Sequence, residues 1–488
     1  MIGTTIPAEK ERFDLVCVGT GFATAFFLIG YLRNAPASSR VLVLERGRRN
    51  PHAWQIAHRA NSDVDWKDTF VRRGDPAKDW RFNIGFGGGS SCWFGNVPRM
   101  MPSDFRLHSQ HGVGIDWPVS YEDLEPYYLD AERLLHVSGP SEDSPMPRSG
   151  DYPQPPHRFS DPDVLLKRAW PDHHFAVPTA RARVATANRS ACCANGVCSL
   201  CPVDAKLTIE NELLAPNEDP RVNVLLEADV MSVETRGGLA EGVRYRHGGC
   251  ERTVDAELVA LGANALFNPH IMLRSGIEHP RLGRRLHEIA SIRAEIFLDG
   301  VDNFGGSTVV TGHNYALYDS PRRSEHAAVL IETWNVGTLR AEYGKWRGVL
   351  PVVILAEDLP QDRNRVEVSP EDADRPIAVF EARSEYALRG LEAAKRLLPE
   401  VMASLPVERI EYRDELTLAG SQIQGTVMMG NDPATSIVDS HLVHHGLRNL
   451  LVLGSSAFPT GPGANPTLTL CALSLRAADY LLANPRMA

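Results

Sequence analysis

A short segment near the start of the sequence constrains the fold more than any other. Residues 13–47 read FDLVCVGTGFATAFFLIGYLRNAPASSRVLVLERG. The apolar runs at 14–18 and 41–44 predict two short buried strands, and residues 22–32 predict a helix between them. A strand, a helix and a second strand in this order form a βαβ unit, so the sequence predicts an α/β fold.

The turn between the first predicted strand and the helix contains two glycines, Gly19 and Gly21. Glycines at this spacing let the backbone approach a pyrophosphate at a helix N-terminus. Glu45 follows the second strand, where a carboxylate accepts a hydrogen bond from a ribose 2′-OH. Thr24 occupies the position of the third glycine of this fingerprint. The pattern predicts a dinucleotide site, and the alternative is an ordinary strand–turn–helix without a ligand.

Length and charge limit the classes of protein that remain. A chain of 488 residues is too long for one ordinary domain, so we expect two intertwined domains. The net charge of −10 argues against a nucleic-acid partner. No apolar run reaches the roughly 18 residues of a membrane span. The first residues contain neither a twin arginine nor an apolar signal core, so we expect a cytoplasmic protein. Export with a partner subunit would not show in the sequence.

A second glycine-rich segment, residues 83–105, reads NIGFGGGSSCWFGNVPRMMPSDF. A backbone with so few side chains is suited to close contact with a flat or charged ligand. The alternative is a flexible surface loop, but the aromatic residues of this segment are costly to leave in solvent.

The middle of the chain predicts a second sheet. Residues 291–385 alternate polar and apolar over short stretches that include AEIFLDG, PVVILAED and NRVEVSP. This alternation is typical of an antiparallel sheet with one solvated face. Other predicted elements are strands within 222–234, 242–245 and 256–261 and helices at 268–274 and 386–405.

Four segments together resemble the glucose–methanol–choline (GMC) oxidoreductase family, in particular its sugar and gluconate dehydrogenase branch. They are GGGSSCWFGNVPR, the segment at 114–139, GTVMMGNDP at 425–433, and NLLVLGSSAFPTGPGANPTLTLCALSLRAADYL at 449–481. The resemblance implies FAD as cofactor. It also implies a Rossmann-like FAD-binding domain built from discontinuous segments, and a substrate domain with a mostly antiparallel sheet. The FAD-binding domain would comprise residues 1–105, 202–290 and 421–488. The substrate domain would comprise 106–201 and 291–420, including a cysteine loop at 192–201.

The resemblance also implies a set of cofactor contacts. They would come from the first turn and helix, the glycine-rich segment, one middle strand and the C-terminal segment. The residues are Gly19, Gly21, Phe22, Ala23, Glu45, Arg46, Gly88, Gly89, Ser90, Ser91, Cys92, Asn96, Val230, Ser455, Pro466 and Thr467. Some family members carry a histidine bonded to the flavin at the position of Cys92. A thioether at Cys92 would need a thiolate, whereas a buried cysteine is usually a small apolar residue.

Half of the eight cysteines lie within ten residues, at Cys192, Cys193, Cys198 and Cys201. Thiolates are soft ligands, and four so close in sequence can meet around one inorganic core. The segment resembles the iron–sulfur loop of the FAD-dependent glucose and fructose dehydrogenases, which implies a 3Fe–4S cluster that relays electrons. The partner would then be an electron-acceptor protein or a small accessory subunit. Zinc is the main alternative, because four thiolates also satisfy a structural zinc site. Disulfides or free thiols are the third reading.

The catalytic residues depart from the family pattern. Oxidation of an alcohol needs a base for the hydroxyl proton while hydride leaves the carbon. The resemblance places this base three residues before the Gly-Thr of GTVMMG, where this chain has Gln422, and its partner at Asn465. Glutamine is not a base near neutral pH. Another residue could be the base, with His313 as the candidate and His441, His444 and His445 expected in a solvated turn. Otherwise the substrate needs little proton removal, or hydride chemistry is absent.

The sequence therefore predicts an FAD-dependent dehydrogenase with a small polar substrate. The expected reaction is oxidation of a hydroxyl of a sugar, amino sugar, cyclitol or glycoside, with electrons passing through an iron–sulfur cluster. The alternative, raised by Gln422, is a redox-silent flavoprotein that acts as a lyase or a binding protein.

Overall fold

The opening βαβ unit is present at the positions that the sequence predicts. The computed structural model describes residues 2–3, 5–413 and 421–484. Strand β1 (Glu11–Val18) leads into helix α1 (Phe22–Asn34) and then into β2 (Val41–Leu44), which pairs with β1 in parallel. Both strands are buried on both faces in their paired parts, as expected of a parallel sheet.

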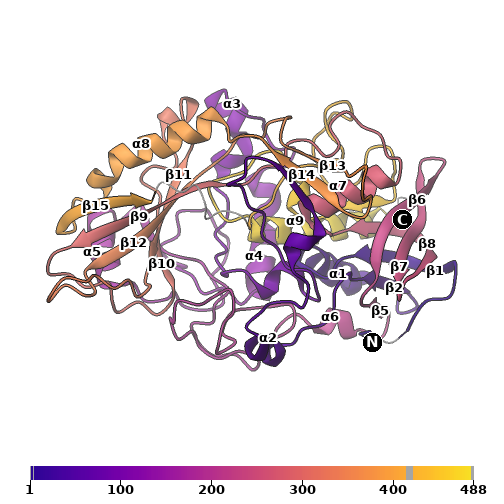
Figure 1. Cartoon of the computed structure of the whole chain (residues 1–488), viewed down its shortest axis with the longest axis horizontal. Helices are drawn as coiled ribbons and strands as arrows, with labels where there is room; N and C mark the ends of the chain where they lie inside the picture. Colours follow the sequence, from indigo (N-terminus) through magenta and orange to yellow (C-terminus); the bar gives the residue numbers. More distant parts are fainter. Residues whose placement is uncertain (1, 4, 414–420, 485–488) are drawn as a thin grey trace.

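This unit belongs to a seven-stranded sheet at one end of the molecule (Figure 1). Its strand order is β5-β2-β1-β8-β7-β6, with β16 also paired to β8. The strands around β1 are parallel, whereas β7 pairs antiparallel with both β6 and β8. The further strands are β5 (Val222–Leu225), β6 (Asp229–Arg236), β7 (Leu239–His247), β8 (Cys250–Leu261) and β16 (Leu450–Val452).

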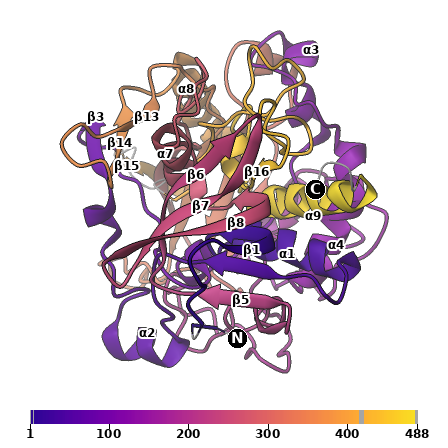
Figure 2. The ribbon, with the colours of Figure 1, turned by 90° about the vertical axis from the view of Figure 1, so that its right-hand side faces the viewer.

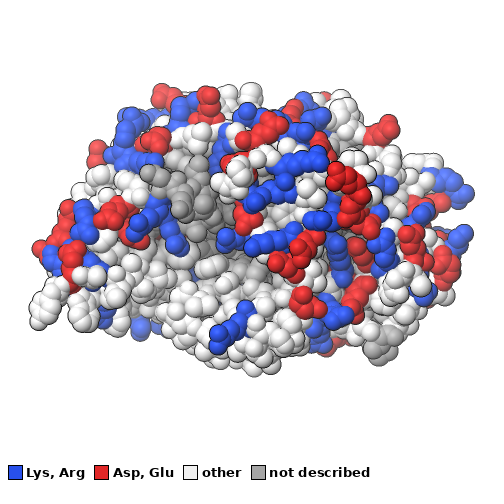
Figure 3. All heavy atoms as spheres, viewed as in Figure 1, with Lys and Arg blue, Asp and Glu red and all other residues white. Residues whose placement is uncertain are grey.

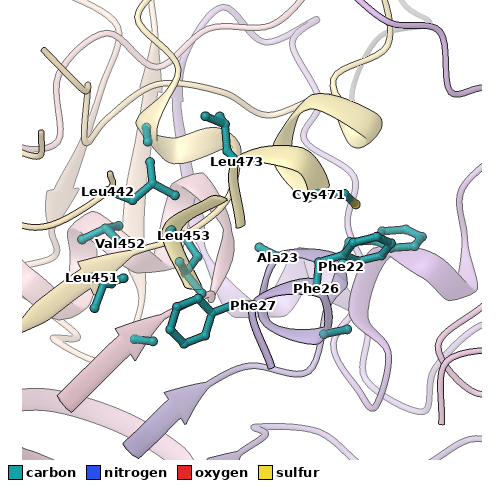
Figure 4. Close-up of a cluster of buried hydrophobic side chains, with 14 of the residues drawn as sticks. Phe22, Ala23, Phe26, Phe27, Leu442, Leu451, Val452, Leu453, Cys471 and Leu473 are labelled. Carbon is teal, nitrogen blue, oxygen red and sulfur yellow. The ribbon is translucent and has the colours of Figure 1, made fainter. Parts of the chain in front are cut away.

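Helix α9 (Thr467–Ala483) brings the end of the described chain back onto α1. A Cβ at Gly30 of α1 would lie 2.7 Å from the Cβ of Ala478, so the two helices approach more closely than another residue allows. Figure 4 shows the phenylalanine side chains of α1 in one cluster with Leu451 and Val452 of β16 and with Cys471 and Leu473 of α9. In Figure 2, α1, α9 and α4 (Tyr121–Leu134) lie together on one side of the sheet. Residues more than 400 positions apart thus share one core.

The second sheet has six strands and is antiparallel throughout. Its order is β15-β9-β12-β11-β10-β4, and helix α8 (Glu385–Val401) packs across one face (Figure 1). Apolar side chains of α8 meet Ile292 of β9 and Ile354 of β12 on that face. The strands are β4 (His174–Ala176), β9 (Ala290–Leu298), β10 (Val310–Asn314), β11 (Val329–Trp334), β12 (Val349–Ala356) and β15 (Val407–Arg413).

One segment that the alternation pattern assigned to the antiparallel sheet lies elsewhere. NRVEVSP forms β13 (Arg365–Val368), which pairs with β14 (Pro376–Phe380) and through it with β3 (Val71–Gly74). The alternation correctly predicts a strand, but it does not show which sheet the strand joins. The sheet is completed by β3, because Ile377 of β14 pairs with Val71, 306 residues earlier in the chain.

Shorter elements connect the sheets. The helix predicted at 386–405 is present as α8, but it ends at Val401, four residues earlier than expected. The other helices are α2 (His52–His58), α3 (Leu107–His111), α5 (Asp161–Ala169), α6 (Ala215–Glu218) and α7 (Asn264–Arg274). Single 3-10 turns are η1 (Trp66–Thr69), η2 (Gly88–Ser91), η3 (Pro102–Arg106), η4 (Pro321–Ser324) and η5 (Ser455–Ala457). In the described part of the chain, no helix is both long and apolar enough to cross a membrane.

A buried ion network fastens these connections to the second sheet. Arg323 donates to Asp104 Oδ1 (2.5 Å) and to Glu357 Oε2 (2.6 Å), and its side chain is 1% exposed. Tyr386 at the start of α8 donates to the same Glu357 (2.6 Å). On the outer surface, by contrast, basic and acidic side chains interleave in contact with water (Figure 3).

Replacing Arg323 with Met tests this network. We expect a loss of about 3–5 kcal/mol in the free energy of unfolding, because two buried carboxylates lose their cation. Urea unfolding followed by tryptophan fluorescence measures it. The control is Arg12→Met, which breaks the exposed Arg12–Glu257 pair and should cost less than about 1 kcal/mol. Equal effects of the two variants would contradict the assigned role.

Candidate active site

A cavity of about 500 Å³ lies between the two large sheets. Its walls come from the N-terminal turns of α1 and α9, the glycine-rich segment, the ends of β1, β2 and β8, and one face of the six-stranded sheet. Most residues predicted to contact the cofactor line this cavity: Gly19, Gly21, Phe22, Ala23, Glu45, Arg46, Gly88, Gly89, Cys92, Asn96, Val230, Ser455, Pro466 and Thr467. Gln422 and Asn465 line it as well.

Three of the predicted residues lie behind the cavity wall. Ser90 donates from Oγ to the Gly87 carbonyl (2.7 Å) and accepts from the Ile209 amide (3.1 Å), so it fixes the glycine loop. Ser91 offers its backbone carbonyl to Lys206. His313 is fully buried on β10 and contacts Glu332, which itself lines the cavity.

Glu45 ties the two glycine segments together. Its Oε2 accepts hydrogen bonds from the amide (3.0 Å) and hydroxyl (2.7 Å) of Thr20, and its Oε1 accepts from the Gly47 amide (2.9 Å). The Thr20 hydroxyl accepts in turn from the Gly87 amide (2.9 Å). Burial raises the pKa of Glu45, and these hydrogen bonds oppose that shift. These hydrogen bonds hold the first turn and the glycine-rich loop in a fixed position relative to each other at the cavity.

The departure at Thr24 is compensated on the neighbouring strand. A Cβ at Gly262, directly after β8, would lie only 2.1 Å from Thr24 Oγ1. In the usual fingerprint, a third glycine on the helix lets the helix pack closely against the neighbouring strand. Here the helix has Thr24, and the glycine that permits this packing is Gly262 at the end of the strand.

The six-stranded sheet presents a polar face to the cavity. Ser291 and Arg293 of β9 and Glu332 and Trp334 of β11 line it, together with Val353 of β12. The register explains the set, because Glu332 is opposite Val353 and Val353 is opposite Arg293. Directly opposed residues of an antiparallel sheet point to the same face. The sequence analysis did not identify these residues, although a carboxylate inside the apolar stretch AAVLIETW was a usable signal.

Several buried polar atoms at the cavity have no hydrogen-bond partner among the described residues. They are Asn96 Oδ1, Ser291 Oγ, Arg293 Nε, Gln422 Oε1 and Asn465 Oδ1. An unpaired buried polar group costs about 1–3 kcal/mol, so native proteins leave few of them. Their concentration in one cavity indicates a polar ligand.

Glu332 is the carboxylate of this polar face, and its side chain is 5% exposed. Its Oε1 accepts from Asn96 Nδ2 (3.0 Å) and from His313 Nε2 (3.2 Å). Its Oε2 accepts from the indole of Trp334 at the longer distance of 3.3 Å. The carboxylate is held in place through one oxygen, and the other is less engaged.

The four clustered cysteines lie outside the cavity wall, and all cysteines of the chain are free thiols. Cys198 is buried, Cys193 is exposed, and Cys201 Sγ accepts from the Ala205 amide (3.3 Å). Among the described residues, no three His, Cys, Asp or Glu side chains form a group that could hold a metal ion. The side chains as placed do not fit the predicted iron–sulfur cluster or zinc, and the disulfide reading is not supported.

Lys206 connects the cysteine loop to the cavity. The residue is 2% exposed, and its ammonium group donates to the carbonyls of Ser91 (2.7 Å) and Ser199 (3.3 Å). Burial lowers the pKa of Lys206 to about 8, although nearby Cys92, Cys198 and Cys201 oppose the shift. Burial likewise raises the pKa of the Cys92 thiol, which disfavours the thiolate that a thioether bond requires.

The sequence is similar to a known family of oxidoreductases along most of its length. Two family models, both described as GMC oxidoreductase, match residues 176–289 and 356–474. The chain is 28% identical to the fructose dehydrogenase large subunit of Gluconobacter japonicus, over 97% of this chain and 98% of that protein. It is 26% identical to 6'''-hydroxyparomomycin C oxidase of Streptomyces lividus, over 96% and 91%.

Solved structures share the fold. A formate oxidase from Aspergillus oryzae RIB40, studied for modification of its FAD, superposes with a TM-score of 0.70 at 15% identity. The alignment covers 99% of this chain and 100% of that one. The predicted α/β architecture with a second sheet is therefore confirmed. The family models and these relatives show that the chain belongs to the GMC oxidoreductase family of FAD-dependent dehydrogenases and oxidases.

Proposed function

We propose that this protein oxidises a hydroxyl group of a sugar, amino sugar, cyclitol or glycoside by hydride transfer to FAD. The observation that carries the proposal is the set of unpaired polar atoms around one cavity, from Asn96, Ser291, Arg293, Gln422 and Asn465. A substrate with several hydroxyl or amino groups can satisfy both donors and acceptors of this kind. The relatives named for fructose and for a hydroxyparomomycin support the same substrate class.

The residues at the first turn fit the pyrophosphate of FAD. Gly21 is the N-cap residue of α1, and a Cβ there would meet no described atom within 4 Å. A Cβ at Gly88 would lie 3.2 Å from Gly21 Cα, so the two glycine segments are in contact. The amide groups at the start of α1 and its helix dipole attract an anion into this space.

The C-terminal segment fits the flavin ring. Asn465 and Pro466 line the cavity directly before α9, and Thr467 is the first residue of that helix. When bound, FAD would supply the two-electron acceptor for hydride. The side chains of Asn465 and Gln422 would orient the substrate by hydrogen bonds, and the surrounding apolar wall would exclude water.

We also propose that the cysteine loop binds an iron–sulfur cluster and that electrons leave through a partner protein. Four thiols within ten residues are the donor set that supports it. Lys206 supports it as well, because it joins this loop to the wall of the flavin cavity. The thiols would have to come together from their described positions, so no step of the reaction is derived through the cluster.

The redox role is tested by mixing the FAD-loaded protein, without oxygen, with fructose, gluconate, a cyclitol and an aminoglycoside. We expect at least one of them to bleach the visible absorbance of the oxidised flavin. The absence of bleaching with every compound would favour the alternative, a redox-silent flavoprotein in which Gln422 replaces the base. Binding without bleaching, measured by calorimetry, would identify that case.

Gly21→Val tests the pyrophosphate position. The backbone of Gly21 is extended (φ −72°, ψ −176°) and a side chain has room, so we expect unchanged thermal stability of the apoprotein. The side chain would fill the anion site, so FAD affinity should fall by roughly tenfold or more. Gly337→Val is the control, because Gly337 also has room for a Cβ but is exposed outside the cavity. Normal FAD content in Gly21→Val would contradict the assignment.

The cluster is tested on protein purified without air. We expect bound iron with acid-labile sulfide and a paramagnetic signal, all lost in Cys198→Ser. Cys250→Ser changes an exposed thiol outside the loop and should leave the iron content unchanged. Zinc in place of iron would support the structural zinc site, and protein with neither metal would end both readings.

A further inference from the structure

In this chain, the two positions at which the family pattern places its catalytic residues do not supply a base. Gln422 and Asn465 line the cavity, but amide side chains do not accept protons near neutral pH. The guanidinium group of Arg293 has no acceptor atom, and burial raises the pKa of the Cys92 thiol. None of these four side chains can take the hydroxyl proton of an alcohol under ordinary conditions.

Other titratable groups of the cavity belong to its nucleotide end, and they include His270 of α7, whose pKa is lowered to about 4 by burial and by nearby Arg274. Glu45 accepts hydrogen bonds from the turn after β1, and Asp374 forms an ion pair with Arg274 (3.0 Å). Asp229, at the start of β6, faces Arg46 at 3.4 Å. These contacts occupy the carboxylates at the seven-stranded sheet, away from the face formed by β9, β11 and β12.

We propose that Glu332 is the catalytic base of this protein and that His313 positions it. This assignment rests on the proposed function and names the residue that performs its proton transfer. Glu332 is the carboxylate that the described part of the six-stranded sheet presents to the cavity, where it contacts Asn96 and lies two strands from Arg293. A general base must lie within hydrogen-bond reach of the proton it takes, and a group on a rigid strand meets that need.

The two oxygens of Glu332 have different surroundings. Oε1 accepts from both Asn96 and His313, whereas Oε2 has only the longer contact with Trp334 among the described residues. His313 must carry its proton on Nε2 to donate to this carboxylate, which fixes its tautomer. Its Nδ1 has no hydrogen-bond partner among the described residues, so His313 is itself oriented mainly by packing. Oε2 is the atom available to a substrate.

The proposed reaction breaks two bonds of the substrate. The O–H bond of the substrate breaks and its proton passes to Glu332 Oε2. The C–H bond of the carbon that carries this hydroxyl breaks, and FAD, when bound, would accept the hydride. The carbon would be oxidised by two electrons to a carbonyl with FAD as the two-electron acceptor, and the proton leaves Glu332 for water when the product departs.

Glu332→Gln tests the assignment, because it keeps the size of the side chain and removes the base. With a substrate that bleaches the wild-type flavin, we expect the anaerobic reduction rate to fall by about 10²–10⁴-fold. The FAD content and the apparent substrate affinity from the same titration should stay near wild type. Glu295→Gln is the matched control on β9, since Glu295 pairs with Arg413 (2.8 Å) outside the cavity. It should leave the rate unchanged.

Chemical rescue separates a base from a structural carboxylate. In Glu332→Ala, acetate should restore flavin reduction in proportion to its concentration. His313→Asn should lower the rate less than Glu332→Gln, because His313 acts through Glu332, and the reverse order would make His313 the base. A near-wild-type rate in Glu332→Gln, or a loss in Glu332→Ala that acetate does not change, would overturn the proposal. If no compound reduces the wild-type flavin, the proposed function fails first, and the role of Glu332 with it.

Discussion

The close approach of three backbone segments beside α1 is the constraint on which the cavity depends. A Cβ at Gly19 would lie 2.8 Å from the Gly262 carbonyl, and one at Gly88 would lie 3.2 Å from Gly21 Cα. Gly19 also has a φ of +88°, which side chains rarely tolerate. Because the turn, the glycine loop and the end of β8 touch through backbone atoms, the hydrogen bonds of Glu45 and Thr20 can lock them together. The anion site at the start of α1 follows from this contact.

The six-stranded sheet supplies the opposite wall through simple alternation. On β9 and β12, Ile292 and Ile354 face α8, while Arg293 and Val353 face the cavity. The apolar face is stabilised by burial against the helix, at about 25 cal/mol for each Å² of apolar surface removed from water. The cavity face carries unpaired polar atoms, whose cost is recovered only when a ligand satisfies them. Stability and function thus lie on opposite faces of the same strands.

Local patterns in the sequence predicted the parts of the site that are local in the structure. Gly19, Gly21 and Glu45 lie within one βαβ unit, and their spacing is enough to identify them. Ser291, Arg293 and Glu332 were missed because they become neighbours only through the pairing of β9, β12 and β11. His313, the candidate base from the sequence, lies behind the cavity wall and contacts Glu332, which lines the cavity. Gln422 raised the question of another base but did not identify one, and the proposal of Glu332 depends on the register of the second sheet.

The most direct measurement is an experimental structure of the FAD-loaded protein with a non-reacting polyol in the cavity. The account predicts the flavin ring between the turn before α9 and the polar face of the second sheet. It also predicts a ligand hydroxyl about 3 Å from Glu332 Oε2. A flavin bound elsewhere, or a polyol whose hydroxyls leave Glu332 without contact and meet another base, would contradict it.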